Sequence, residues 1–156
     1  MKDVPGSLGT PGGLALRASQ CLCSLASLAA MATAFGFSNY SAFFFLVLSM
    51  FLELLWSFTL LCVDIHSLKH KTDLHNHGLI LIFMMGDWIV AISSAATACS
   101  AAAVAIFLEG DIKFCRVYQH VSCSQFKASV ILAFMAWSFV AASATSNFFL
   151  FVSLLP

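Results

Sequence analysis

The sequence has few charged side chains. Asp, Glu, Lys and Arg make up 9% of its 156 residues, whereas soluble domains have about 25%. Hydrophobic residues account for 61% of the chain, and its mean hydropathy is +0.96. This composition excludes a soluble globular protein, because too few polar groups remain to cover a surface in water, and it indicates an integral membrane protein. The seven basic and seven acidic residues balance, so charge gives no basis for nucleic-acid binding.

Four apolar stretches are long enough to cross a bilayer. They cover residues 14–35, 42–63, 79–108 and 128–154. Because a membrane-spanning helix needs roughly 20 apolar residues, the sequence predicts an all-α integral membrane four-helix bundle over residues 14–155. Residues 1–13 are rich in Gly and Pro and are expected to form a flexible cytosolic tail. The apolar run after Arg17 is longer than the roughly 7–15 residues of a signal-peptide core, which favours a retained first helix.

The distribution of basic residues leaves the orientation of the helices open. With the N-terminus inside, the cytosolic side carries Lys2, Arg17, Lys69 and Lys71, and the outer side carries Lys113, Arg116 and Lys127. Cys115 and Cys123 share the polar loop 109–127, and disulfides persist on the oxidising side of a membrane. A bridge between these two cysteines would place that loop outside and both termini in the cytosol. Free or lipidated thiols are the alternative.

Two ionisable residues lie inside predicted spans in the same leaflet. With the N-terminus inside, Arg17 is roughly 5 Å and Asp87 roughly 12 Å from the inner end of its span, at 1.5 Å per residue. Charges at such depths are costly and usually have partners. We therefore expect a bidentate Arg17–Asp87 pair between the first and third helices. Alternatively, Arg17 extends to the headgroups and Asp87 bonds to serines or to Trp88.

A third ionisable residue, Glu53, is predicted to lie near the middle of the bilayer. Its depth is roughly 18 Å in the second span. One interpretation is structural, with the carboxyl group hydrogen-bonded to Ser or Thr on a neighbouring helix. The other is that Glu53 lies at the centre of a proton or cation path, although such a path needs more polar groups in series.

The third and fourth spans are unusually rich in Ala, Ser and Thr. Small side chains let helices approach closely in lipid, where dispersion contacts stabilise association. Part of this surface is expected to close the bundle and the rest to join neighbouring copies. The Phe-rich segments 43–45 and 148–149 are expected to meet lipid.

Four histidines crowd the polar segment 64–78. They are His66, His70, His75 and His77. The first two share a helix face if the second helix extends that far, and neutral imidazoles bind zinc or copper. The histidine boxes of membrane di-iron enzymes occur on several separate segments, whereas this chain has one cluster. We therefore interpret the segment as a solvated loop, with no metal, no cofactor and no catalytic residue expected.

Several short motifs together resemble a known family. They are Arg17 in the first span, Phe37-Ser38-Asn39-Tyr40, Gly86-Asp87-Trp88, and Phe114-Cys115 with Cys123 and Phe126. The combination is similar to the Casparian strip membrane protein-like family of plants, most closely its subfamily 5. The resemblance implies four helices related to the MARVEL fold, cytosolic termini, a plasma-membrane location and homo- or hetero-oligomers. It also implies that Arg17 and Asp87 are the intramembrane pair of the family.

The founding members of that family form immobile plasma-membrane domains and recruit secreted enzymes that build lignified wall. Their extended signature in the first outer loop is absent here, where residues 36–41 form only a short turn. The resemblance therefore implies a membrane scaffold more firmly than a particular wall polymer. We expect a non-enzymatic scaffold that binds copies of itself, related members and lipid. The alternative is a small proton- or ion-coupled transporter or channel that uses Glu53 and Asp87.

Overall fold

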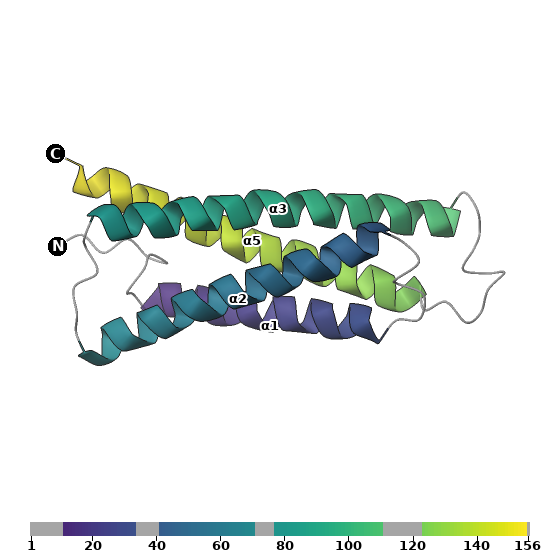
Figure 1. The fold of residues 1–156 in the computed structure, drawn as a ribbon, viewed down its shortest axis with the longest axis horizontal. Helices are drawn as coiled ribbons and strands as arrows, with labels where there is room; N and C mark the ends of the chain where they lie inside the picture. The colour runs from purple at the N-terminus through teal and green to yellow at the C-terminus, as the bar shows by residue number, and fades with distance from the viewer. Residues whose placement is uncertain (1–10, 34–40, 71–76, 111–122, 156) are drawn as a thin grey trace.

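Four long helices make up almost all of the part of the chain that the structure describes (Figure 1). The computed structural model describes residues 11–33, 41–70, 77–110 and 123–155. The helices are α1 (Pro11–Ala32), α2 (Ser41–His70), α3 (His77–Gly110) and α5 (Cys123–Leu154). Each is long and apolar enough to cross a membrane. The predicted all-α membrane fold is thus confirmed.

The four helices pack as a closed square. α1 lies against α2 and α5, and α3 lies against the same two helices, so α1 and α3 occupy opposite corners. In Figure 1, α3 runs along the top of the bundle and α1 along the bottom, with α2 and α5 crossing between them. Any direct bond between α1 and α3 must therefore cross the centre of the bundle.

One end of the interior is apolar, and the rest combines buried polar and apolar side chains. The apolar cluster consists of Met31, Phe43, Leu46, Met50, Ala98, Ala101, Phe126, Val130 and Ala133. It lies where α1 ends and α2 and α5 begin, and its aromatic centre is a Phe43–Phe126 stack with centroids 4.5 Å apart. Phe43 is fully buried there, so the expectation that it meets lipid is wrong, whereas Phe44 and Phe45 are exposed. Consecutive helical residues point about 100° apart, so one segment cannot present every ring to lipid.

Helix α2 continues to His70, beyond the predicted end of the span at Val63. Hydropathy falls at Asp64, but no Gly or Pro interrupts the following turns. Asp64 and Ser67 also face the interior, with exposed fractions of 0% and 6%. The segment from Asp64 to His70 is therefore helix and not loop, and Asp64 and Ser67 pack inside the bundle beyond the end of the apolar run.

Helix α1 begins at Pro11, inside the predicted tail. Proline suits the first position of a helix, since its missing N–H would have no intrahelical acceptor there. The loop predicted over 109–127 is likewise shortened at both sides, because α3 extends to Gly110 and α5 begins at Cys123. These extensions leave the number and order of the spans unchanged.

Candidate functional site

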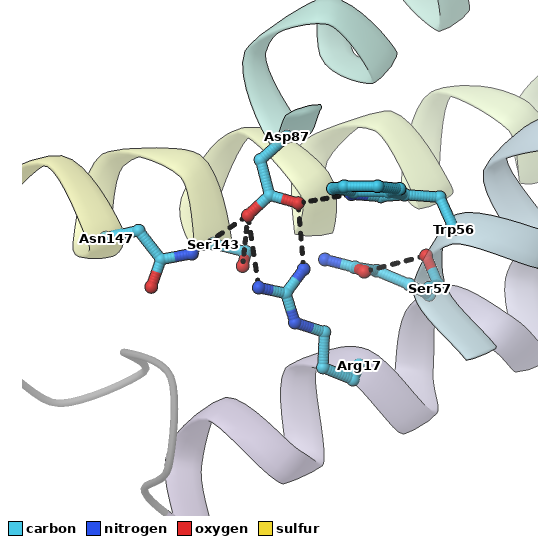
Figure 2. A network of polar contacts seen from close by, with 7 residues as sticks. Arg17, Trp56, Ser57, Asp87, Ser143 and Asn147 are labelled. Atoms are coloured by element: carbon cyan, nitrogen blue, oxygen red, sulfur yellow. Dashed lines mark hydrogen bonds and ion pairs between the residues drawn. The ribbon is translucent and has the colours of Figure 1, made fainter. Parts of the chain in front are cut away.

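An ion pair between Arg17 and Asp87 crosses the centre of the bundle (Figure 2). The Nη1 atom of Arg17 donates to Oδ1 of Asp87 at 3.0 Å, and Nη2 donates to Oδ2 at 3.1 Å. The two side chains are 1% and 0% exposed. The structure thus brings together the two residues that the cost of intramembrane charge predicted as partners. Two parallel bonds fix the orientation of both groups and join opposite corners of the square.

Asp87 also accepts hydrogen bonds from the other two helices. Trp56 of α2 donates its indole N–H to Oδ1 at 2.9 Å, and the Asn147 amide of α5 donates to Oδ2 at 2.9 Å. The Ser143 hydroxyl lies 3.4 Å from Oδ2, a longer contact. Figure 2 shows these donors converging on the carboxylate. A buried carboxylate needs such bonds to offset its desolvation, and here they come from α1, α2 and α5 together.

Gly86 provides the space that the Trp56 indole occupies. A Cβ atom added at Gly86 would overlap the six-membered ring of Trp56. Trp56 also meets Phe83 edge to face, with centroids 6.5 Å apart. Gly86 therefore leaves space for the indole to pack against α3, and Asp87, the next residue, accepts a hydrogen bond from the indole N–H. This explains a glycine inside a long helix, where it costs about 1 kcal/mol relative to Ala.

Further polar contacts continue along the interior face of α1. The Ser57 hydroxyl donates to Oε1 of Gln20 at 3.0 Å, and the Ser24 hydroxyl donates to Oε1 of Glu53 at 3.0 Å. Glu53 is fully buried, so this bond matches the structural interpretation of its carboxyl group. These contacts join α1 to α2 on successive turns. Next to the apolar cluster, the hydroxyls of Ser27 and Ser129 lie 3.1 Å apart and join α1 to α5.

Two atoms in this polar layer have no hydrogen-bond partner within the part of the chain that the structure describes. They are Nε2 of Gln20 and Oε2 of Glu53. One atom is a donor and the other an acceptor, and both side chains are 0% exposed. Unsatisfied buried atoms of this kind are rare in folded proteins. The Gln20–Glu53 layer is therefore less completely bonded than the Asp87 centre.

The histidines are only partly placed. His66 and His70 lie in the last turns of α2, on its exposed face, with ring centroids 4.6 Å apart. His75 and the side chain of His77 lie outside the described residues, so the predicted four-histidine cluster is not tested. The described residues contain no group of three or more His, Cys, Asp or Glu that could hold a metal ion.

The predicted Cys115–Cys123 bridge also falls outside what the structure describes. Cys115 belongs to the segment 111–122, and only the backbone of Cys123 is described, as the first residue of α5. The bridge, and the orientation of the helices that it implies, therefore remain predictions.

The sequence reasoning missed three of the donors to Asp87. Trp56 looks like one more large apolar side chain, although a buried indole N–H needs an acceptor. Asn147 carried a clearer signal, because it is the only amide side chain in the charge-free fourth span. Polar side chains in such spans commonly bond to neighbouring helices. Ser143 carried no such signal in the sequence, since serines are frequent throughout the third and fourth spans.

Replacing Asn147 with Leu is expected to destabilise the bundle by about 0.6–1.7 kcal/mol, the range for one interhelical hydrogen bond in a membrane. Its amide is a close donor to Oδ2 of Asp87, at 2.9 Å. Ser143→Ala is the matched control, because its longer 3.4 Å contact should contribute less. Unfolding of the purified variants in mixed micelles measures both. An equal loss for the two variants would contradict the ranking of the donors.

Comparison with known proteins agrees with this architecture. Residues 6–139 match the model of the Casparian strip membrane protein domain. CASP-like protein 5B3 of Oryza sativa subsp. japonica is 55% identical over 154 residues, covering 99% of this chain and 100% of the relative. CASP-like protein 5B1 of Arabidopsis thaliana is 42% identical over 152 residues, covering 97% and 100%. CASP-like protein 5B2 of Arabidopsis thaliana is 41% identical over 153 residues, covering 98% and 99%. No solved structure matches the chain. The chain therefore belongs to the CASP-like family of membrane proteins, which carry the Casparian strip membrane protein domain.

Proposed function

We propose that the protein is a non-enzymatic scaffold that self-associates in the plasma membrane and organises a membrane domain. The observation that carries this proposal is the enclosure of the polar centre. Arg17 and Asp87 are 1% and 0% exposed, and donors from three helices surround the carboxylate. A centre of this kind stabilises the shape of the bundle, whereas a catalytic carboxylate must be reached by substrate.

A row of small residues on the outside of α3 supports self-association. Ser93, Ala96, Ser100 and Ala103 are all exposed and follow one another at spacings of three and four residues; we call them the α3 stripe. Ala96 and Ser100 also line a groove of about 370 Å³, which Ser41, Ala42 and Phe45 of α2 border on the other side. Because small residues permit close backbone approach in lipid, a helix of a second copy can pack here.

The apolar cluster argues against the rival function of a transporter or channel. A path through Glu53 and Asp87 would have to continue along the bundle axis. Beyond Ser27 and Ser129, however, the interior is filled by apolar side chains around the stacked rings of Phe43 and Phe126. A hydrophobic constriction is a barrier to ions. This observation favours a structural role for the buried carboxylates.

The proposal also covers the cellular setting. Following the family resemblance, we place the protein in the plasma membrane with both termini in the cytosol, an arrangement that four spans allow. Copies of the chain and related family members are the proposed partners within the membrane. Secreted wall-modifying enzymes are the proposed partners outside, recruited by the loops on that face.

Photobleaching of a fluorescently tagged chain in its native plasma membrane tests the scaffold directly. The unmodified chain is expected to form patches whose fluorescence recovers slowly. Ala96→Phe should fill the groove beside the α3 stripe and weaken self-association by about 1–2 kcal/mol, or about 5–30-fold, so that recovery becomes faster and more uniform. Ala96 is exposed, so the monomer should still fold.

Leu52→Phe is the matched control, because Leu52 is 55% exposed on α2 and lies outside the groove. This variant adds aromatic bulk at a lipid-facing position two helical turns beyond Phe45, outside the groove, and should recover as slowly as the unmodified chain. Fast, uniform recovery of the unmodified chain would contradict the scaffold. Slow recovery of Ala96→Phe would show that self-association uses another surface.

A further inference from the structure

Two histidines form a close pair on the surface of α2, away from the polar interior. His66 and His70 are four residues apart in the last turns of the helix, and both are exposed. Their ring centroids are 4.6 Å apart, and the ring planes are tilted by 47°. Neither residue belongs to the Asp87 network, so the bundle does not explain their pairing. The pair lies at the opposite end of α2 from Phe43 and the apolar cluster.

We propose that His66 and His70 form a surface site for a divalent transition metal such as Cu²⁺, Zn²⁺ or Ni²⁺. Histidines at i and i+4 on one helix face can bind the same metal ion, as in zinc-binding helices. Imidazole nitrogens bind such metals at about 2.0–2.1 Å, so two rings that share an ion must lie almost in contact. The observed spacing of the two rings meets this requirement. Ca²⁺ and Mg²⁺ do not fit, because they prefer oxygen ligands.

The position of the pair at the end of α2 has two opposing electrostatic effects. The carbonyl groups of the final turn have no intrahelical partners, and the negative end of the helix dipole favours a cation. Lys69 lies three residues after His66 and repels a cation. It is exposed, however, so water and salt screen its charge. The chelate formed by two imidazoles therefore decides the affinity.

Within the described residues the site has two protein ligands, which leaves its other coordination positions to water. Structural zinc sites are closed by four protein ligands, and the free energy of zinc binding contributes to the stability of the fold. The His66–His70 site is open by comparison, so its metal exchanges with solution and its occupancy follows the metal concentration. This inference does not depend on the scaffold, and either can fail without the other.

Titration of the purified full-length chain in detergent micelles with Cu²⁺ tests the site, with electron paramagnetic resonance as the readout. We expect one Cu²⁺ per chain whose spectrum shows coupling to two imidazole nitrogens. His66→Asn and His70→Asn should each lose that signature and weaken binding at least about tenfold, because the second ligand no longer binds intramolecularly. Zn²⁺ should compete for the same site only in large excess, because imidazole sites bind Cu²⁺ more tightly than Zn²⁺.

Two control variants separate a chelate from general histidine binding. Ile65→His combined with His66→Asn keeps the number of histidines but moves one about 100° around the helix, so it should bind as weakly as the single variants. His120→Asn, outside the pair, should bind like the unmodified chain. Unchanged Cu²⁺ affinity in His66→Asn and His70→Asn, or in the shifted variant, would overturn the proposal. All substituted positions on α2 are exposed, and circular dichroism verifies that the helices remain intact.

Discussion

Asp87→Ala and Arg17→Ala are each expected to destabilise the bundle by about 3–5 kcal/mol, the cost of removing one partner from a buried ion pair. The Asp87 variant should lose more. It leaves the guanidinium without its acceptor and also removes the acceptor of Trp56 and Asn147. In Arg17→Ala the carboxylate keeps those neutral donors. The free energy of unfolding in mixed micelles, and the yield of monodisperse protein, would measure both effects.

The double variant Arg17→Met with Asp87→Leu supplies the decisive comparison. It removes both charges and fills the space with apolar groups of similar size, a change that is often tolerated for buried ion pairs. We expect it to be more stable than Asp87→Leu alone, so that the two losses are strongly non-additive. Lys69→Ala is a surface control and should change stability little. Additive losses in the double variant would contradict a direct energetic pairing.

Gly86→Ala is expected to have the second largest effect, although it adds a single methyl group. The new Cβ atom would overlap the Trp56 indole, so either the ring or a helix must move. Overpacking costs about 1–3 kcal/mol. Displacement of the indole also breaks the bond from Trp56 to Asp87, and a hydrogen bond to a charged group contributes about 1.5–3 kcal/mol. The unfolding free energy and a change in Trp fluorescence would measure the two effects.

Gly110→Ala is the matched control on the same helix, because an added Cβ there meets no atom within 4 Å. It should be neutral or slightly stabilising. In a Trp56→Leu background, Gly86→Ala should cost much less than in the native chain, since the ring that it displaces is gone. If Gly86→Ala lowered the free energy of unfolding as much in that background, the glycine would be required by helix α3 itself and not by the packing of the indole.

The fold could be predicted from the sequence because length and hydropathy alone identify a membrane-spanning helix. The same reasoning failed at Asp64 and Ser67, which hydropathy assigns to a loop but which continue α2 and face the interior. The expectation that Phe43 meets lipid was wrong for a related reason, because composition does not reveal which side of a helix faces the bundle. Hydropathy therefore predicts how many spans exist, but it does not predict that α2 continues past the end of its apolar run.

Only the charged residues of the candidate site could be predicted, because a charge without a partner in lipid has a large energetic cost. Arg17 and Asp87 could be paired because each is costly in lipid without a partner. The bond from Ser24 to Glu53 agreed with one of two open interpretations. Trp56 and Ser143 were missed because they are neutral and resemble many other residues of the spans. Their roles depend on the rotation of α2 and α5 about their axes, which a single sequence does not define.

The Arg17–Asp87 ion pair also has a consequence for how the chain is made. Its two residues are separated by 70 positions, so at about 5–20 residues per second the ribosome needs roughly 4–14 s to reach the aspartate after the arginine. During that interval the guanidinium has no acidic partner from α3. Helix α1 also has the lowest mean hydropathy of the four spans, at 1.4 against 1.7 to 2.1. The first helix is thus the one least suited to remain alone in lipid. We therefore expect α1 to become stable in the membrane only after Asp87 has been synthesised, so that α1 and α3 integrate together and not one after the other.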